Sequence, residues 1–193
     1  MEVHNLTTSS TLKVLLNNRL LEKSEAVVNI DTVAFKYGAM VFEGLRAYWN
    51  DQTQQLNVFR LDDHARRLEK SVRVMRMETE LIAQDYSAAV LRALQLNDVR
   101  TTSHIRQMVF VDGPGQAFVA GPVSHAVIVT PKGGWFDGKE FGIHSCFSSW
   151  QRISDNAIPP RVKCAANYQN ARLALMQAHL DGYDSALLLN AAG

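Results

Sequence analysis

The sequence predicts an α+β protein with two lobes, of which the second is incomplete. Strand patterns and helix patterns occur in separate runs over residues 1–130, which is typical of an α+β lobe. A glycine-rich stretch over residues 131–141 then has the composition of a linker. Residues 142–193 end after one helix and one further strand pattern, which leaves the edges of a sheet unpaired and its apolar face uncovered.

Composition excludes several classes of protein. The chain has 193 residues, a formal net charge of +1 and 47% hydrophobic residues. A charge this small gives no long-range field for attracting nucleic acid, and no apolar run is long enough to span a membrane. Cys146 and Cys164 make neither a disulfide framework nor a zinc pattern, and the N-terminus lacks the layout of a signal peptide. We therefore expect a globular cytoplasmic protein without a metal.

The first lobe should begin with strands. Residues 12–30 have the pattern of two short strands that are joined by a polar turn at Asn17 and Asn18. Residues 37–48 (YGAMVFEGLRAY) mix β-forming residues with two glycines, which indicates a strand close to other backbone. Residues 55–59 should return beside it as the second strand of a hairpin.

Two helices and two strands should complete this lobe. Apolar residues recur at helical spacing from Leu61 to Met75, and Asp62 is positioned to cap the helix. A second helix is expected over residues 85–96. Residues 105–111 and 126–130 have strand patterns, with a glycine- and proline-rich loop between them.

The second lobe has fewer elements. Residues 143–148 have a strand pattern, and the segment IPPRVK is expected as an extended turn that enters a helix over residues 167–180. Gly182 can adopt the left-handed conformation that ends a helix. Residues 185–189 (SALLL) follow as a candidate buried strand.

Lys163 is the first candidate for chemistry. It lies in PPRVKCAANYQN, where two prolines fix the approach and small apolar residues surround the side chain. Poor solvation lowers the pKa of a lysine and makes its amine available as a nucleophile. The alternative is an ordinary surface lysine before a helix.

Two arginines are candidates for binding anions. Arg60 follows a strand and precedes a helix, so its guanidinium and the first helical amides could hold a phosphate group. The alternative is a surface ion pair with Asp62 or Asp63. Arg106 lies in an alternating strand, where it either faces a pocket and binds a carboxylate or faces solvent.

Several aromatic residues could line a pocket or belong to the core, and they are Tyr37, Phe42, Trp135 and Tyr168. His64 and His104 are expected to make ordinary polar contacts, because no partner ligand stands at a metal-binding spacing.

Taken together, the segments YGAMVFEGLRAY, VFRLDDHARRL, HIRQ and IPPRVKCAANYQNARLALMQAHLDGYDSALLLN resemble the class IV aminotransferases, which use pyridoxal phosphate. Within that family they most resemble the branched-chain amino acid aminotransferases. The resemblance extends from Leu12 to Gly193. It implies a two-lobed fold of the D-amino acid aminotransferase type, with an open sheet and two helices in the first lobe and the cofactor between the lobes.

The resemblance also implies roles for individual residues. Lys163 would be the lysine that joins the cofactor aldehyde and then moves the substrate proton. Arg60 would hold the cofactor phosphate and Tyr168 would contact the phenolic oxygen of its ring. Tyr37 and Phe42 would line the aliphatic pocket, and Arg106 would bind the distal carboxylate of glutamate. The expected reaction is transamination of branched-chain or related aliphatic L-amino acids with 2-oxoglutarate.

The chain departs from the family pattern at named positions. His104 and Gln107 stand where branched-chain enzymes carry a tyrosine and a proline, so we expect a changed amino acid preference. Lys132 stands where an aromatic residue is common, and Trp135 is expected to supply that wall. The family's glutamate against the pyridine nitrogen comes after the point where this sequence stops. We therefore expect the 193-residue chain alone to be inactive and prone to aggregation.

Two alternatives to a transaminase remain at this stage. One is a class IV lyase of the aminodeoxychorismate type, and the other is a non-catalytic dimerisation or binding remnant. The segment VFEGLRAY argues against the lyase, because lyase members of the family vary there. The family also implies a homodimer, in which Tyr37 would reach the pocket of the partner.

Overall fold

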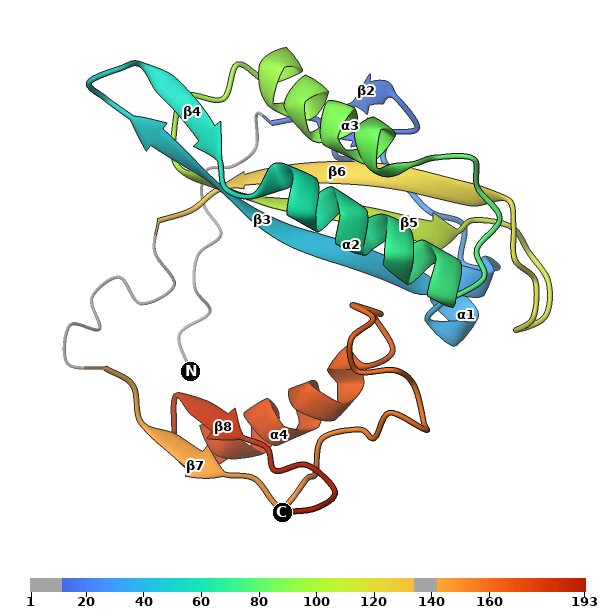
Figure 1. Ribbon diagram of the computed structural model, residues 1–193, viewed down its shortest axis with the longest axis vertical. Coiled ribbons are helices and arrows are strands. Elements are labelled where there is room, and N and C mark those ends of the chain that lie inside the picture. Colours follow the sequence, from blue (N-terminus) through green and yellow to red (C-terminus); the bar gives the residue numbers. More distant parts are fainter. Residues whose placement is uncertain (1–11, 134–141) are drawn as a thin grey trace.

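The computed structural model of the protein describes residues 12–133 and 142–193 (Figure 1). Its main feature is a six-stranded antiparallel sheet in the order β2-β1-β6-β5-β3-β4. The strands are β1 (Val14–Leu16), β2 (Arg19–Leu21), β3 (Met40–Asn50), β4 (Gln55–Val58), β5 (Ser103–Val111) and β6 (Val123–Pro131). The predicted α+β class is confirmed.

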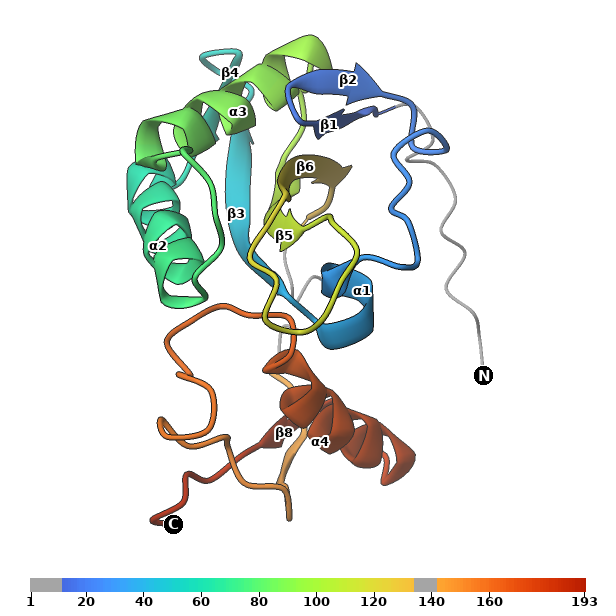
Figure 2. The same cartoon turned by 90° about the vertical axis from the view of Figure 1, so that its right-hand side faces the viewer.

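Two helices cover one face of this sheet, α2 (Leu61–Val74) and α3 (Ala83–Leu96) (Figures 1 and 2). Alternate residues of the strands point toward them, so Leu45 of β3 and Ile105 of β5 are fully buried. The buried side of α2 is the apolar stripe that contains Ala65 and Leu68, as its helical spacing predicts. The hydrophobic core of the first lobe therefore lies between the sheet and these helices.

The remaining elements form a smaller unit. Strands β7 (Ser145–Phe147) and β8 (Ser185–Leu187) pair in parallel, and α4 (Tyr168–Leu180) lies between them in the chain. Figure 1 shows this unit below the large sheet, with α4 beside the strand pair. The predicted linker over 131–141 falls largely on residues 134–141, which lie outside the described residues, and so do residues 1–11.

Backbone hydrogen bonds join the two units at the beginning of β3. The Phe42 amide donates to the Lys163 carbonyl at 2.9 Å, and the Ala165 amide donates to the Met40 carbonyl at 2.9 Å. Cys164 is thereby paired with Val41 in an antiparallel bridge. The segment with Lys163 is in this way fixed to the edge of the large sheet.

One helix was absent from the sequence prediction. Residues Val33–Tyr37 form α1, and Tyr37 lies in this helix rather than in the strand predicted over 37–48. The Thr32 hydroxyl accepts a hydrogen bond from the Phe35 amide at 3.2 Å, and Gly38 ends the helix at a φ of 71°. A threonine cap and a left-handed glycine are the usual boundary signals of a helix, and here they enclose little more than one turn.

Some predicted boundaries were also wrong. Asp62 does not cap α2, because the helix begins at Leu61 and Arg60 occupies the cap position with a φ of 50° and no side-chain hydrogen bond to the helix. The strand predicted up to residue 30 ends at Leu21. In contrast, the turn at Asn17 and Asn18 is confirmed, and both residues have the positive φ that such a tight turn requires.

Candidate functional site

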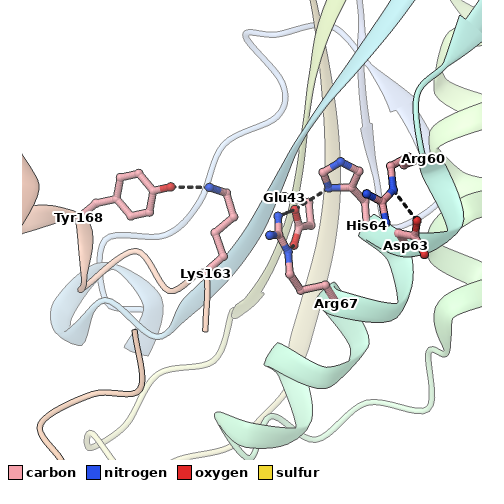
Figure 3. A network of polar contacts seen from close by, with 7 residues as sticks. All are labelled: Glu43, Arg60, Asp63, His64, Arg67, Lys163 and Tyr168. Atoms are coloured by element: carbon pink, nitrogen blue, oxygen red, sulfur yellow. Dashed lines mark hydrogen bonds and ion pairs between the residues drawn. The ribbon is translucent and has the colours of Figure 1, made fainter. Parts of the chain in front are cut away.

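Lys163 and Tyr168 lie together at the beginning of α4. The Lys163 amine donates a hydrogen bond to the Tyr168 hydroxyl (Figure 3). The lysine nitrogen also lies 5.0 Å from the centre of the Tyr168 ring and 5.0 Å from that of Phe42, and the two rings are 4.9 Å apart. A single amine therefore lies against two aromatic side chains that come from different units of the fold.

A cavity of about 520 Å³ opens beside this amine. Its lining is rich in positive charge and contains no carboxylate, and it consists of Arg67, Arg152, Pro160, Arg161, Val162, Lys163, Asn167, Tyr168 and Ala171. A concave site that gathers cations favours an anionic ligand. The cavity is large enough for a small organic molecule.

Asn167 holds the loop that carries Lys163. It is 2% exposed, and its amide nitrogen donates to the carbonyls of Val162 at 3.2 Å and Pro159 at 3.4 Å. Its amide oxygen lies buried with no hydrogen-bond partner among the described residues. A buried polar atom without a partner is costly, and one that borders a cavity is placed to bind a donor group on a ligand.

Arg67 extends from α2 toward the same cavity. A bidentate ion pair with Glu43 holds its guanidinium, because Nε donates to Oε1 at 2.6 Å and Nη2 donates to Oε2 at 2.5 Å. The Glu43 carboxylate raises the pKa of Arg67, first through this hydrogen bonding. His64 contacts the same carboxylate through Nδ1 at 2.9 Å, which confirms the polar contact expected for this histidine.

The open face of the large sheet extends the site away from α4. Arg106 of β5 lies on this face, with its guanidinium carbon 5.8 Å from the centre of the Phe42 ring. His104 is on the same face two residues before it, and its Nε2 approaches Gly44 so closely that a β-carbon there would lie 3.1 Å away. Burial lowers the pKa of His104, and the charges of Arg106 and Lys132 lower it further. The charged side chains Arg106 and Lys132 therefore form a second group of cations near the site.

Not every candidate residue reaches this site. Arg60 is absent from the lining of the Lys163 cavity, and it makes the surface ion pair with Asp63 that was its alternative role, with Nε 2.6 Å from Oδ2. Tyr37 lines a separate cavity of about 620 Å³. Trp135 lies outside the described residues. Lys163, Tyr168, Phe42 and Arg106 are the predicted residues that the fold brings together.

Sequence reasoning missed Arg67 and Glu43. The signal in the sequence was Glu43, a glutamate inside an otherwise apolar strand. Val41 and Leu45, two residues before and after it, face the core, so Glu43 faces the core as well. A buried carboxylate requires a cation or several hydrogen-bond donors, and the next helix offers Arg67 beside its apolar stripe. That combination would have added Arg67 to the candidate residues.

Comparison with known proteins identifies the relatives of this chain. Residues 40–193 match the family described as amino-transferase class IV. A probable branched-chain-amino-acid aminotransferase of Aquifex aeolicus is 33% identical over 91% of this chain and 57% of that protein. The branched-chain-amino-acid aminotransferase of Escherichia coli is 28% identical over 97% of this chain and 62% of that protein.

Solved structures agree with these matches. The branched-chain aminotransferase of Thermoproteus uzoniensis, crystallised with norvaline, has a TM-score of 0.89 at 34% identity, covering 94% of this chain and 61% of that one. The enzyme of Thermobaculum terrenum in its PLP form has a TM-score of 0.86 at 34% identity, over 96% and 61% of the two chains. The chain therefore spans about three fifths of the length of the proteins it matches.

Proposed function

We propose that this chain, which belongs to the class IV aminotransferase family, is the part of a pyridoxal-phosphate-dependent transaminase that carries the reactive lysine. The observation that supports this most directly is the position of Lys163. Its amine is hydrogen-bonded to the Tyr168 hydroxyl, enclosed by two aromatic rings and adjacent to a cationic cavity. An oriented amine beside an anion site is the arrangement that a phosphorylated aldehyde cofactor requires.

The residues of the cavity fit such a cofactor. Lys163 supplies the amine, Tyr168 supplies a hydroxyl at the distance of a hydrogen bond from it, and Arg67 supplies a guanidinium for a phosphate. The unpartnered oxygen of Asn167 leaves one acceptor for a donor group. We propose Arg60, at the start of α2, as the phosphate-binding arginine, as the family resemblance implies, and Arg67 as a second guanidinium that lines the cavity.

When bound, pyridoxal phosphate supplies an electron sink for the bond electrons at the substrate α-carbon. Lys163 would act as the base and acid that moves the α-proton at its Nζ atom. Tyr168 orients that atom by accepting its hydrogen bond, and the rings of Phe42 and Tyr168 exclude water from one side of it. Arg60 would hold the phosphate end, with Arg67 in the cavity lining, so that the reacting end stays next to Nζ.

The open sheet face supports an amino acid substrate. We propose that Arg106 binds a substrate carboxylate and that Phe42 contacts an aliphatic side chain, since the two lie together beside Lys163. A pocket with one apolar wall and one guanidinium can accept both a branched-chain amino acid and glutamate. We propose that His104, which lies on the same face and close to Gly44, helps to set the preference among aliphatic side chains.

We further propose that the protein works as a homodimer in the cytoplasm. Apolar side chains around α1 are exposed, namely Phe35 at 68%, Tyr37 at 48% and Phe118 at 87%, and surfaces of this kind are typical of subunit contacts. Both cysteines are free thiols, which supports a reducing compartment. Among the described residues, no helix is long and apolar enough to cross a membrane.

The test is covalent trapping at Lys163. The protein is expressed from its full reading frame, loaded with pyridoxal phosphate and reduced with borohydride, and its peptides are mapped by mass spectrometry. We expect the reduced adduct on the peptide that contains Lys163, because its amine is the one held beside the cavity. Lys163→Ala should lose both the adduct and the absorbance of the bound cofactor.

Lys36→Ala is the matched control, since Lys36 pairs with Asp31 away from the cavity. An adduct that persists in Lys163→Ala on another peptide would contradict the assignment of the lysine. Adding glutamate to the loaded protein should shift its absorbance to that of the aminated cofactor, which separates a transaminase from a lyase. A loaded protein whose spectrum glutamate leaves unchanged would exclude a glutamate-dependent transaminase.

A further inference from the structure

We infer that Asn167 is a positioning residue for Lys163: the amide nitrogen of its side chain holds the loop before α4, so that the lysine amine stays beside the cavity. This role rests on the proposed function, in which Lys163 is the residue that receives the cofactor. Asn167 acts through the backbone of the loop, and its effect on the position of the amine can be measured without a cofactor.

Asn167 does not use its side chain as an asparagine at the start of a helix usually does. The oxygen of an asparagine in this place normally accepts a hydrogen bond from an amide of the first helical turn. Thr32 accepts such a bond before α1, whereas Asn167 has a helical backbone, with φ −65° and ψ −23°, and makes no cap bond to the described residues of α4. Because the residue is 2% exposed, its side chain is not directed to solvent either. It is turned back toward the preceding loop.

Two hydrogen bonds join this side chain to the loop. The Asn167 Nδ2 atom donates to the Val162 carbonyl at 3.2 Å and to the Pro159 carbonyl at 3.4 Å. Because both carbonyls can only accept, the nitrogen end of the amide must face them, and an oxygen in its place would be repelled. The Val162 amide also donates to the Pro159 carbonyl at 3.0 Å. Asn167 therefore closes the turn that leads directly to Lys163.

The peptide groups on both sides of Lys163 are held. The Val162 carbonyl, which accepts from Asn167, also accepts from the Cys164 amide at 2.8 Å, so Lys163 is the central residue of a three-residue turn. On the other side, the Lys163 carbonyl accepts from the Phe42 amide at 2.9 Å. Asn167 and β3 together therefore fix the direction in which the Lys163 side chain leaves the backbone.

That direction decides what the Lys163 amine can reach. In Figure 3 the Nζ atom points to the Tyr168 hydroxyl, and it lies 5.0 Å from the centre of the Phe42 ring. Tyr168 directly follows Asn167, so one short segment of the chain holds both the loop and the hydroxyl that accepts from the amine. Loss of the Asn167 hydrogen bonds should therefore displace the amine although neither of these partners is removed.

The first test measures the position of the amine without a cofactor. The full-length protein is freed of pyridoxal phosphate and treated with a trace of acetic anhydride, and mass spectrometry compares the acetylation of Lys163 with that of Lys36 in the same sample. We expect Asn167→Ala to raise this ratio about threefold or more, because an amine that leaves the Tyr168 hydroxyl and the Phe42 ring becomes more accessible. Lys36, which is in an ion pair away from the cavity, corrects for a general loss of folding.

The second test measures the attachment of pyridoxal phosphate. The cofactor is added to the same protein, borohydride stops the reaction at timed intervals, and the adduct on the Lys163 peptide is quantified. Asn167→Ala should slow the attachment about tenfold or more, because the amine is no longer held next to the cavity. Faster acetylation together with slower attachment is the result expected of a displaced amine, whereas unfolding would raise the acetylation of both lysines.

Two further variants isolate the hydrogen bonds. Asn167→Asp keeps the size of the side chain and an oxygen acceptor but, when ionised, has no donor for the two carbonyls, so we expect it to behave like Asn167→Ala. Asn97→Ala is the matched control, since Asn97 binds the Lys13 backbone of the first lobe through Oδ1 at 2.7 Å and Nδ2 at 3.1 Å. It should leave both values within about twofold of the wild type. Circular dichroism checks that each variant is folded.

The outcomes separate the role of Asn167 from the proposed function. A wild-type protein that attaches no pyridoxal phosphate at Lys163 would contradict the proposed function, and the acetylation ratio would still test the role of Asn167. A folded Asn167→Ala or Asn167→Asp variant that keeps the wild-type ratio and attachment rate would overturn the role of Asn167 alone. An equal change in Asn97→Ala would overturn it as well, because the effect would then not depend on the loop before α4.

Discussion

The two faces of the large sheet come from the same strands but differ in what they contribute. On the helix-covered face, Leu45, Ile105 and Val109 are fully buried beneath α2 and α3. On the open face, Phe42 lies near both Lys163 and Arg106. Since side chains alternate along a strand, one strand can supply core on one side and a candidate site on the other. In each of these strands, one face therefore contributes to the stability of the fold and the other contributes to the candidate site.

The helix-covered face is not uniformly apolar. Glu43, Gln107 and His125 lie on it as a polar row, and Glu43 and Gln107 are direct partners across β3 and β5. The amide nitrogen of Gln107 lies 3.0 Å from Nε2 of His125 and donates to the Tyr86 carbonyl at 2.8 Å. Apolar clusters lie on both sides of this row. Each residue of this row has a hydrogen-bond or ion-pair partner, which offsets part of the cost of its burial.

We expect the largest difference between the two faces in the free energy of unfolding when a core side chain is removed. Leu45→Ala should lower the free energy of unfolding by about 3 kcal/mol, because it removes a fully buried side chain and leaves a cavity. Phe42→Ala, on the half-buried open face, should lower it by about 1 kcal/mol at most while impairing cofactor binding. Urea unfolding followed by circular dichroism measures both values. Equal losses of stability in the two variants would contradict the expected difference between the two faces.

Lowering the pH should reduce the stability of the protein, because the polar row contains the buried His125. Burial lowers the pKa of His125 to about 4, below the value of about 6.5 expected in the unfolded chain. Between these values the unfolded chain binds a proton that the folded protein excludes, so stability falls as pH falls from 7 to 4. The loss from this one group is about 3 kcal/mol at its limit.

His125→Gln is the variant for this measurement, because glutamine keeps an acceptor for Gln107 and does not titrate. We expect its unfolding free energy to depend less on pH over this window than that of the wild type, while the carboxylates contribute equally to both. An identical pH dependence in the two proteins would show that His125 is not excluded from protonation in the fold.

The smallest expected effect separates two arginines of one helix region. Arg60→Ala should weaken pyridoxal phosphate binding about tenfold or more, because the family resemblance assigns the phosphate to this arginine at the start of α2. Arg67→Ala should weaken it less, since Glu43 already engages one edge of the Arg67 guanidinium. Equilibrium dialysis of the two variants provides the measurement. The reverse order of effects would assign the phosphate to Arg67.

The sequence by itself determined the elements that local physics controls. The apolar stripe from Leu61 predicted α2, alternation predicted β5 and β6, and the asparagine pair predicted the first turn. The small apolar neighbours of Lys163 made it a candidate, and the resemblance to class IV aminotransferases singled it out. Each of these signals is carried by residues close together in the chain, and so it can be read without the fold.

Only the tertiary structure decided which distant residues share the site. The backbone bonds between Phe42 and Lys163 join segments that are far apart in the sequence, and no local pattern encodes that pairing. The pairing of Arg67 rather than Arg60 with Glu43 likewise depends on which side of α2 faces the sheet, because a buried carboxylate holds the cation that can reach it. The charge and type of each residue are properties of the sequence. The burial of a side chain and the direction in which it points arise only when strand, helix and loop pack together.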